Sequence, residues 1–232
     1  MSTLRGLFVS STGTSEGKSV VTCALAAALH RSGLRIAALK PMETGCEPVA
    51  LDAVALAKAC GDPSLAQRPG FYRARLPASP YAVELESEQV APSVDDLKRA
   101  VLEVAQDYQG VLVEGAGGLF VPINRTQLIA DLVHALELPV LLVATDRLGV
   151  LSHVLASVEA ATQRGIRIAA LVLNRNLIDT ADDPSVRTNR LILAERLDFP
   201  VLELPNITQA DLADAASSSG LLRVALSELE NV

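Results

Sequence analysis

The sequence predicts an α/β fold in three layers, with a mostly parallel central sheet between helices. Short, continuous aliphatic runs such as LFV, VLV, PVLLVA and IAALVL are typical of strands buried on both faces of a parallel sheet. Longer stretches of helical character separate these runs, and such alternation is typical of βαβ units. The 232 residues are 50% hydrophobic and 20% charged, which excludes a disordered chain.

The chain is long enough to bury one sizeable core, so we expect residues 1–232 to form a single domain. In chain order, strands are expected at Leu7–Ser10, Leu34–Leu39, Val111–Val113, Val140–Ala144, Ile168–Leu173 and Val201–Leu204. Helices are expected at Lys18–Arg31, Leu51–Ala59, Val94–Asp107, Leu128–Leu136, Val150–Arg164, Ser185–Leu197 and Gly220–Leu229. The proline-rich stretch Arg68–Pro92 is expected to be an irregular excursion at the carboxyl edge of the sheet.

Composition and charge exclude several kinds of partner. The net charge of −7 argues against a nucleic-acid surface, but local N–H groups can still bind a small anion. Cys23, Cys46 and Cys60 are widely spaced, which argues against a disulfide framework or a zinc site. No apolar run approaches the roughly 20 residues of a membrane span, and the N-terminus lacks the features of a signal peptide. We therefore expect a cytoplasmic protein without a membrane or nucleic-acid partner.

The first strand runs into a loop of small residues, STGTSEGKS, and a helix follows. Small residues let backbone N–H groups approach a phosphate, and the helix N-terminus adds partial positive charge. Lys18 would reach the β- and γ-phosphates, and the Ser19 hydroxyl would bind Mg²⁺. The usual G-x4-G-K-[ST] pattern needs glycine where this chain has Thr12, and Gly13 comes one position late. The alternative is an ordinary strand–helix turn with a surface lysine.

Two further polar positions follow buried strands. Lys40, in the motif KPMETG, follows the second strand and could neutralise charge on a transferring phosphoryl group. Glu114 stands at the end of the VLV strand, a position at which an acid in this kind of site holds Mg²⁺ or a water molecule bound to it. The glycines of VEGAGG allow close backbone approach to a ligand. A solvated lysine and a strand-end acid with turn glycines remain the alternatives. Ligands of parallel sheets bind at the carboxyl ends of strands, so we expect these groups to meet there.

These three motifs, in this order, resemble the dethiobiotin synthetase family. The resemblance runs from Leu7 to about Pro205 and includes KPMETGC, VEGAGGLFVP, LPVLLVATDRLGVLSH and ALVLNR. It implies a P-loop NTPase-like fold, a homodimer, and ATP and Mg²⁺ as cofactors. The implied reaction joins 7,8-diaminopelargonate and CO2 or bicarbonate through a carbamate and a carbamic-phosphoric anhydride. The ureido ring closes and ADP and phosphate are released.

The resemblance also implies a role for individual residues. Lys18 and Lys40 would be catalytic, acting on the transferring phosphate and the carbamate. Nucleotide contacts are implied for Gly13, Thr14, Ser15, Glu16, Gly17, Lys18, Ser19, Val20, Asn174 and Pro205. Metal ligation is implied for Ser19, Asp52 and Glu114. Substrate contacts are implied for Thr14, Lys40, Thr44, Gly115, Ala116, Gly117, Gly118, Leu148, Gly149, Val150, Leu151 and Ser152. The last five match a loop that binds the substrate carboxylate across the dimer interface.

The chain departs from the family pattern at a few positions. The family commonly has glycine, aspartate and asparagine where this chain has Ser11, Gly13 and Ser152. The loop acid is at Glu16, one position later than in many members, and the loop before Asp52 is short. These departures concern nucleotide and substrate preference more than the reaction class. The rival interpretation is a non-catalytic nucleotide-sensing module, like the N-terminal domain of some phosphotransacetylases.

Other polar residues leave their roles open. His30, His134 and His153 do not share metal-ligand spacing, and His153 follows the implied carboxylate loop. Ser79 and the proline after it could line the diamine site or form an ordinary turn. Asp146 and its neighbouring arginine could be an exposed pair or part of an interface.

Overall fold

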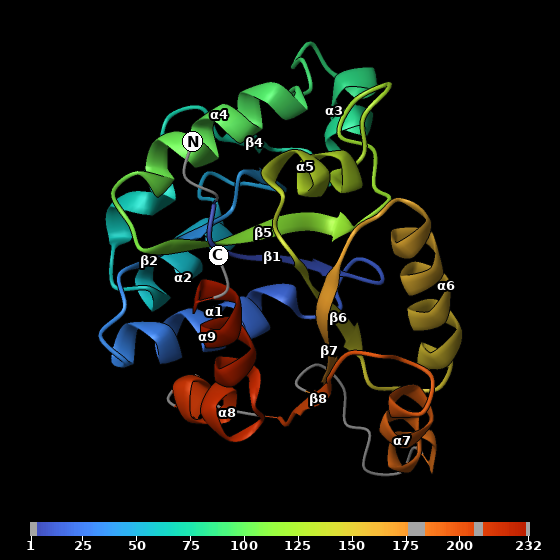
Figure 1. The fold of residues 1–232 in the computed structure, drawn as a ribbon. Helices are drawn as coiled ribbons and strands as arrows, with labels where there is room; N and C mark the ends of the chain where they lie inside the picture. The colour runs from blue at the N-terminus through green and yellow to red at the C-terminus, as the bar shows by residue number, and fades with distance from the viewer. Residues whose placement is uncertain (1–3, 176–183, 207–210, 231–232) are drawn as a thin grey trace.

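The computed structural model describes residues 4–175, 184–206 and 211–230. Over these ranges the chain forms a six-stranded parallel sheet with helices on both sides, as the sequence predicts (Figure 1). The strands of this sheet are β1 (Gly6–Ser11), β2 (Ile36–Leu39), β5 (Gly110–Gly118), β6 (Val140–Thr145), β7 (Ile168–Asn174) and β8 (Val201–Leu204).

The strand order is β2-β5-β1-β6-β7-β8, so the first strand lies inside the sheet. All five neighbouring pairs are parallel, and every residue of β1, β6 and β7 is buried. This burial explains why these strands are continuous aliphatic runs rather than alternating ones. Parallel pairing also brings the carboxyl ends of β1, β2 and β5 to one edge, where the polar motifs follow.

The helices of the described residues are α1 (Lys18–Arg31), α2 (Leu51–Ala59), α3 (Pro80–Glu86), α4 (Val94–Ala105), α5 (Ile129–Leu136), α6 (Val150–Gln163), α7 (Asn189–Ala194), α8 (Leu212–Ser218) and α9 (Leu221–Glu230). Those that flank the sheet lie in two groups. On one side α1 packs against α2, α8 and α9, and on the other α4 packs against α5 (Figure 1). Figure 1 shows α6 and α7 beside the β6–β8 end of the sheet.

The core is aliphatic and joins strands and helices from Leu7 to Ala225 in one cluster. Cys23, Cys46 and Cys60 are all buried as free thiols. Among the described residues, no helix has the length and apolar character to span a membrane.

The proline-rich stretch is more regular than we expected. It contains β4 (Tyr72–Ala74) and α3, and β4 pairs in parallel with β3 (Met42–Thr44) as a small second sheet. Ser79 caps α3 by accepting the Ala82 N–H, with Pro80 in the first turn. The 3-10 helix η1 (Pro63–Gln67) precedes β4. Three-residue strands carry little periodicity, and their pairing joins segments far apart in sequence, so the expectation of an irregular excursion was wrong.

Two boundary predictions were also wrong. The helix expected at Ser185–Leu197 is split into the 3-10 helix η2 (Pro184–Arg187) and α7, and the break falls at Thr188. The strand expected to end at Glu114 continues to Gly118. Its pairing with β1 shifts register, because Glu114 is opposite Val9 but Gly118 is opposite Ser11. The glycines thus form a bulged strand end beside the loop after β1 rather than a separate turn.

Gly6 occupies a position that tolerates no side chain. Its φ is 136°, and a Cβ there would lie 1.8 Å from the Val111 carbonyl oxygen on the neighbouring strand. We predict that Gly6→Ala lowers the free energy of unfolding by about 3 kcal/mol or more, because β1 must shift away from β5. Urea unfolding followed by circular dichroism would measure this loss.

Gly165→Ala is the matched control for that prediction. Gly165 also has a positive φ, 68°, but no described atom lies within 4 Å of its Cβ position. It therefore bears only the backbone strain of about 1 kcal/mol. Equal losses in the two variants would contradict the steric explanation.

Candidate active site

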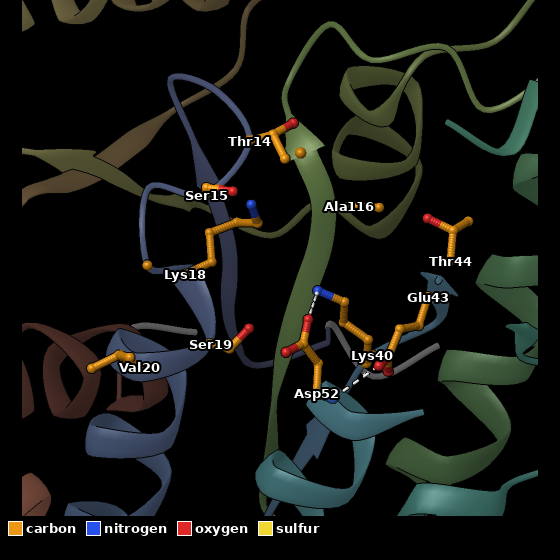
Figure 2. A pocket seen from close by; sticks show the side chains of 12 residues that line it. Thr14, Ser15, Lys18, Ser19, Val20, Lys40, Glu43, Thr44, Asp52 and Ala116 are labelled. Carbon is orange, nitrogen blue, oxygen red and sulfur yellow. Dashed lines mark hydrogen bonds and ion pairs between the residues drawn. The ribbon is translucent and has the colours of Figure 1, made fainter. Parts of the chain in front are cut away.

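A pocket of about 450 Å³ opens where the carboxyl ends of β1, β2 and β5 meet (Figure 2). Its walls come from the loop before α1 and the first turn of α1, from the residue after β2, and from β3, α2 and β5. The lining residues are Thr14, Ser15, Gly17, Lys18, Ser19, Val20, Lys40, Glu43, Thr44, Asp52, Ala116 and Gly117. Figure 2 shows Lys18 and Ser19 on one wall and Lys40 with Asp52 on the facing wall.

The loop between β1 and α1 is built to face an anion. Gly17 precedes α1 with φ 83°, and no described side chain caps this helix. The first-turn N–H groups and the helix dipole therefore favour negative charge in the pocket. Gly118 permits the strand and the loop to approach, since a Cβ there would lie 2.9 Å from the Ser11 carbonyl oxygen.

Lys18 extends from the start of α1 into this loop. Its Nζ donates to Ser11 Oγ at 3.1 Å, so the hydroxyl that replaces the family's glycine contacts the lysine directly. Burial, with the nearby Lys40 charge, lowers the pKa of Lys18 to about 8. The charged ammonium of Lys18 is therefore unfavourable in this pocket, and a bound anion would stabilise it.

The facing wall is organised around the fully buried carboxylate of Glu114. Oε1 of Glu114 accepts from Lys40 Nζ and, at 2.8 Å, from Ser19 Oγ. Oε2 accepts from Thr22 Oγ1 at 2.6 Å. Lys40 Nζ also contacts Asp52 Oδ2 at 3.0 Å and the Gly115 carbonyl oxygen at 3.2 Å. One buried lysine is therefore shared by two carboxylates.

These contacts keep the second wall charged. Burial acts against the ammonium of Lys40, but the Glu114 and Asp52 carboxylates outweigh it and raise the pKa of Lys40. Burial likewise acts against the Asp52 carboxylate, yet Lys40 lowers the pKa of that carboxyl below its ordinary value. Lys18 and Lys40 therefore differ, because only Lys40 has carboxylates in contact with its ammonium among the described residues.

Glu43 is the lining residue that we did not expect from the sequence. Its two carboxylate oxygens accept the N–H groups of Asp52 and Ala53, each at 2.9 Å. It thus caps the first turn of α2 and fixes the backbone that carries Asp52. Arg73 Nη1, from β4, donates to the Lys40 carbonyl oxygen at 2.9 Å, so the small sheet holds this wall. The acid in KPMETG was the available signal, but its partner helix could not be identified from spacing.

The site offers oxygen ligands for a divalent cation. The described residues contain no group of three or more His, Cys, Asp or Glu side chains arranged to hold a metal. Ser19, Asp52 and Glu114 nevertheless supply hydroxyl and carboxylate oxygens around Lys40. Mg²⁺ prefers such hard oxygen ligands and takes its remaining ligands from water and phosphates. The residues present therefore fit a magnesium ion that a nucleotide helps to bind.

Not every residue implied by the family resemblance lines the pocket. Residues of the same segments that are not among the lining residues are Gly13, Glu16, Glu114, Gly115 and Gly118.

Asn174 is the last residue of β7, fully buried, and its Nδ2 donates to the Glu16 carbonyl oxygen at 3.1 Å. Pro205 is exposed after β8. Leu148, Gly149, Val150, Leu151 and Ser152 lie at the start of α6, with Leu148 80% exposed.

The structure also describes two positions whose roles the sequence left open. Asp146 is fully buried and pairs with Arg175 Nε at 2.8 Å and Asn189 Nδ2 at 2.9 Å, so it is not an exposed residue. Its neighbour Arg147 is part-exposed and contacts Glu16. Ser79 serves as a helix cap.

Comparisons with known proteins show what this chain is similar to. A family model described as an AAA domain matches residues 5–212. The ATP-dependent dethiobiotin synthetase of Anaeromyxobacter sp. (strain K) is 40% identical over 223 residues, covering 94% of this chain and 96% of the relative. That of Endomicrobium trichonymphae is 33% identical over 213 residues, covering 90% of this chain and 95% of the relative.

Similarity to solved structures concerns the fold alone. Cobyrinic acid a,c-diamide synthase from Mycobacterium smegmatis, with bound ADP and magnesium, gives a TM-score of 0.58 at 17% identity. The match covers 95% of this chain and 94% of that one. The MinC:MinD complex of Aquifex aeolicus gives 0.57 at 13% identity, covering 97% and 96%. These neighbours confirm the P-loop NTPase-like fold class.

The pKa of Lys18 makes a prediction about pH. The ammonium is present below about pH 8 and is lost above it. If only the charged form binds phosphates, the affinity for Mg²⁺-free ADP falls about eightfold between pH 7.5 and pH 9. Lys40 stays charged over this range because its pKa is raised. Isothermal titration calorimetry at the two pH values would measure the change.

Lys18→Arg is the control, since a guanidinium keeps its charge over the whole range. We expect its ADP affinity to be independent of pH, whatever its absolute value. A wild-type affinity that does not change with pH would contradict the proposed role of the Lys18 charge.

Proposed function

The chain belongs to the dethiobiotin synthetase family, and we propose that its pocket closes the ureido ring of dethiobiotin from 7,8-diaminopelargonate and CO2. The family match makes it an ATP-dependent ligase of biotin biosynthesis. The observation that supports the proposed chemistry is the pair of buried lysines, Lys18 and Lys40, on facing walls of one pocket.

The proposed reaction needs positioning and cations more than acid–base groups. One amine of the diamine forms a C–N bond with CO2 and loses a proton, giving a carbamate. A carbamate oxygen attacks the γ-phosphorus of ATP, and the bond to the bridging oxygen breaks to release ADP. The second amine then attacks the carbamoyl carbon and gives up a proton to solvent. The C–O bond between that carbon and the phosphate breaks, and phosphate leaves as the ring closes.

We assign the two lysines to the charge that develops in the second of these steps. Lys18, at the helix N-terminus, would contact the β- and γ-phosphates. Lys40, opposite it, would contact the transferring phosphoryl group and the carbamate. Thr14, Thr44 and the backbone of 115–118 would orient the substrate. Asn174 and Pro205 would lie toward the base.

We also propose that Ser19, Asp52 and Glu114 hold Mg²⁺, directly or through water. A bound magnesium ion supplies positive charge to the phosphate oxygens. Glu114 can serve this role because its position is fixed by Lys40, Ser19 and Thr22. Asp52 can serve it because it stays ionised beside Lys40.

A homodimer is the remaining part of the proposal. The segment 148–152 lies at the start of α6 outside the pocket lining, and Leu148 is largely exposed. In the proposed dimer this segment reaches the substrate carboxylate of the neighbouring subunit, partly through the helix N-terminus.

ADP release tests the proposed function. Purified protein with ATP, Mg²⁺ and bicarbonate should release ADP only when 7,8-diaminopelargonate is added. Lys18→Ala should reduce this release by at least about a hundredfold, because a charge beside the phosphates is lost. Its circular dichroism spectrum should match the wild type. Nucleotide binding without any effect of the diamine would favour the nucleotide-sensing alternative, and a near-normal rate in Lys18→Ala would remove the assignment of the phosphate loop.

Glu114→Gln tests the metal site. The amide has no charge, so we expect the Mg²⁺ concentration for half-maximal ADP release to rise at least about tenfold. Mg²⁺-dependent ADP binding should weaken in parallel. Glu228→Gln is the control, since Glu228 pairs with Arg167 near the other end of the sheet. An unchanged Mg²⁺ titration would place Glu114 outside the metal shell.

A further inference from the structure

The phosphate loop contains a buried acid, Glu16, that the proposed reaction does not use. Its side chain is 6% exposed. A carboxylate beside a site for polyphosphate is unfavourable unless the charge is compensated, because like charges repel at short range. The residue therefore needs a separate explanation.

The contacts of Glu16 point away from the pocket. One carboxylate oxygen accepts the Thr145 N–H at the end of β6, at 2.6 Å. The other meets Arg147 Nη2 at 3.3 Å. The Glu16 carbonyl oxygen accepts Asn174 Nδ2 at the end of β7. Side chain and backbone of one residue thus join the loop to two neighbouring strands, and Glu16 is not among the residues that line the pocket.

The backbone around Glu16 shows why such anchoring matters. Ser15 has φ 61° and Gly17 has φ 83°, so the residues on both sides have left-handed conformations. The left-handed conformation is strained for a serine, and it is kept only when contacts from the surrounding structure hold it. Ser15, Gly17 and the residues that follow line the pocket, so an error in this backbone would misplace the N–H groups that face the ligand.

The contacts are unequal in strength. Thr145 is buried, so its N–H would be left without a partner if the carboxylate withdrew. Arg147 is 46% exposed at its side chain, and an ion pair that is half in solvent contributes little. The hydrogen bond to Thr145, rather than the charge, carries the anchoring.

We propose that Glu16 is a positioning residue: it fixes the phosphate loop against the ends of β6 and β7 through Thr145 and does not itself contact the nucleotide. This role rests on the use of ATP that is part of the proposed function. It differs from the nucleotide contact that the family resemblance implies for this position.

Two conservative variants separate the effect of the length of the Glu16 side chain from the effect of its charge. Glu16→Gln keeps the length and an oxygen that accepts the Thr145 N–H, but it removes the charge. Glu16→Asp keeps the charge but is one methylene too short to reach Thr145. We expect the Kd for Mg-ADP, measured by calorimetry, to rise at least about tenfold in Glu16→Asp, because the buried Thr145 N–H loses its acceptor. In Glu16→Gln it should stay within about threefold of wild type.

Glu228→Asp is the matched control, because it shortens a glutamate that pairs with Arg167 far from the loop. Its ADP affinity should equal that of the wild type. Melting temperatures without nucleotide show whether each variant is folded. At saturating diamine, Glu16→Asp should raise the KM for ATP more than it lowers kcat, since uniform binding is lost.

Several results would overturn the proposal. ADP binding of wild-type strength in Glu16→Asp would remove the positioning role. A Kd for Mg-ADP that rises about tenfold or more in Glu16→Gln would show that the charge acts, and this result is decisive even if Glu16→Asp does not fold. Wild-type protein that fails to bind ADP would instead contradict the proposed function, which the diamine-dependent release of ADP tests separately.

Discussion

The carboxylate of Glu114 is buried at the point where β5 passes the phosphate loop, and a buried charge is strongly destabilising without compensating partners. Its partners are Lys40, Ser19 and Thr22. Two of these come from the start of α1 and one from the end of β2. Compensating a single charge therefore brings the two walls of the pocket together. The parallel sheet provides the common edge, and Glu114 determines which side chains meet there.

The contrast between the two lysines follows from the same arrangement. Lys40 contacts the carboxylates of Asp52 and Glu114, so the protein itself supplies its counter-charges before a ligand binds. Lys18 contacts a neutral hydroxyl instead, at Ser11. The missing counter-charge is what a phosphate would bring. The two lysines thus differ before any ligand binds: Lys40 already contacts two carboxylates, and Lys18 contacts none among the described residues.

The parts of the site that could be predicted from sequence are those in which a motif directly follows a buried strand. STGTSEGKS after β1, Lys40 after β2 and Glu114 on β5 were found because their positions depend on strand–helix alternation alone. Glu43 was missed because its partners are N–H groups in the first turn of α2, which no spacing in the sequence identifies. Arg73 was missed because its role depends on the pairing of β3 with β4, two short strands separated by α2 and η1. Glu16 was predicted to contact the nucleotide because the loop residues on both sides of it were. No pattern within the loop indicates that its side chain turns toward β6. Asp146 stayed ambiguous because its partners, Arg175 and Asn189, lie on later elements.

The two walls of the pocket also differ in how much backbone structure supports them. The phosphate loop leaves a strand that is hydrogen-bonded on both sides, to β5 and to β6. Thr44 and Glu43 lie on a strand of three residues whose ladder partner, β4, is equally short. Short ladders open locally at lower free energy than central strands. The amide hydrogens of β3 should therefore exchange with solvent sooner than those of β1. The phosphate loop would then be the rigid side of the pocket, and the segment around Thr44 the more easily opened side. The diamine substrate could therefore enter and leave without disturbing the phosphate loop.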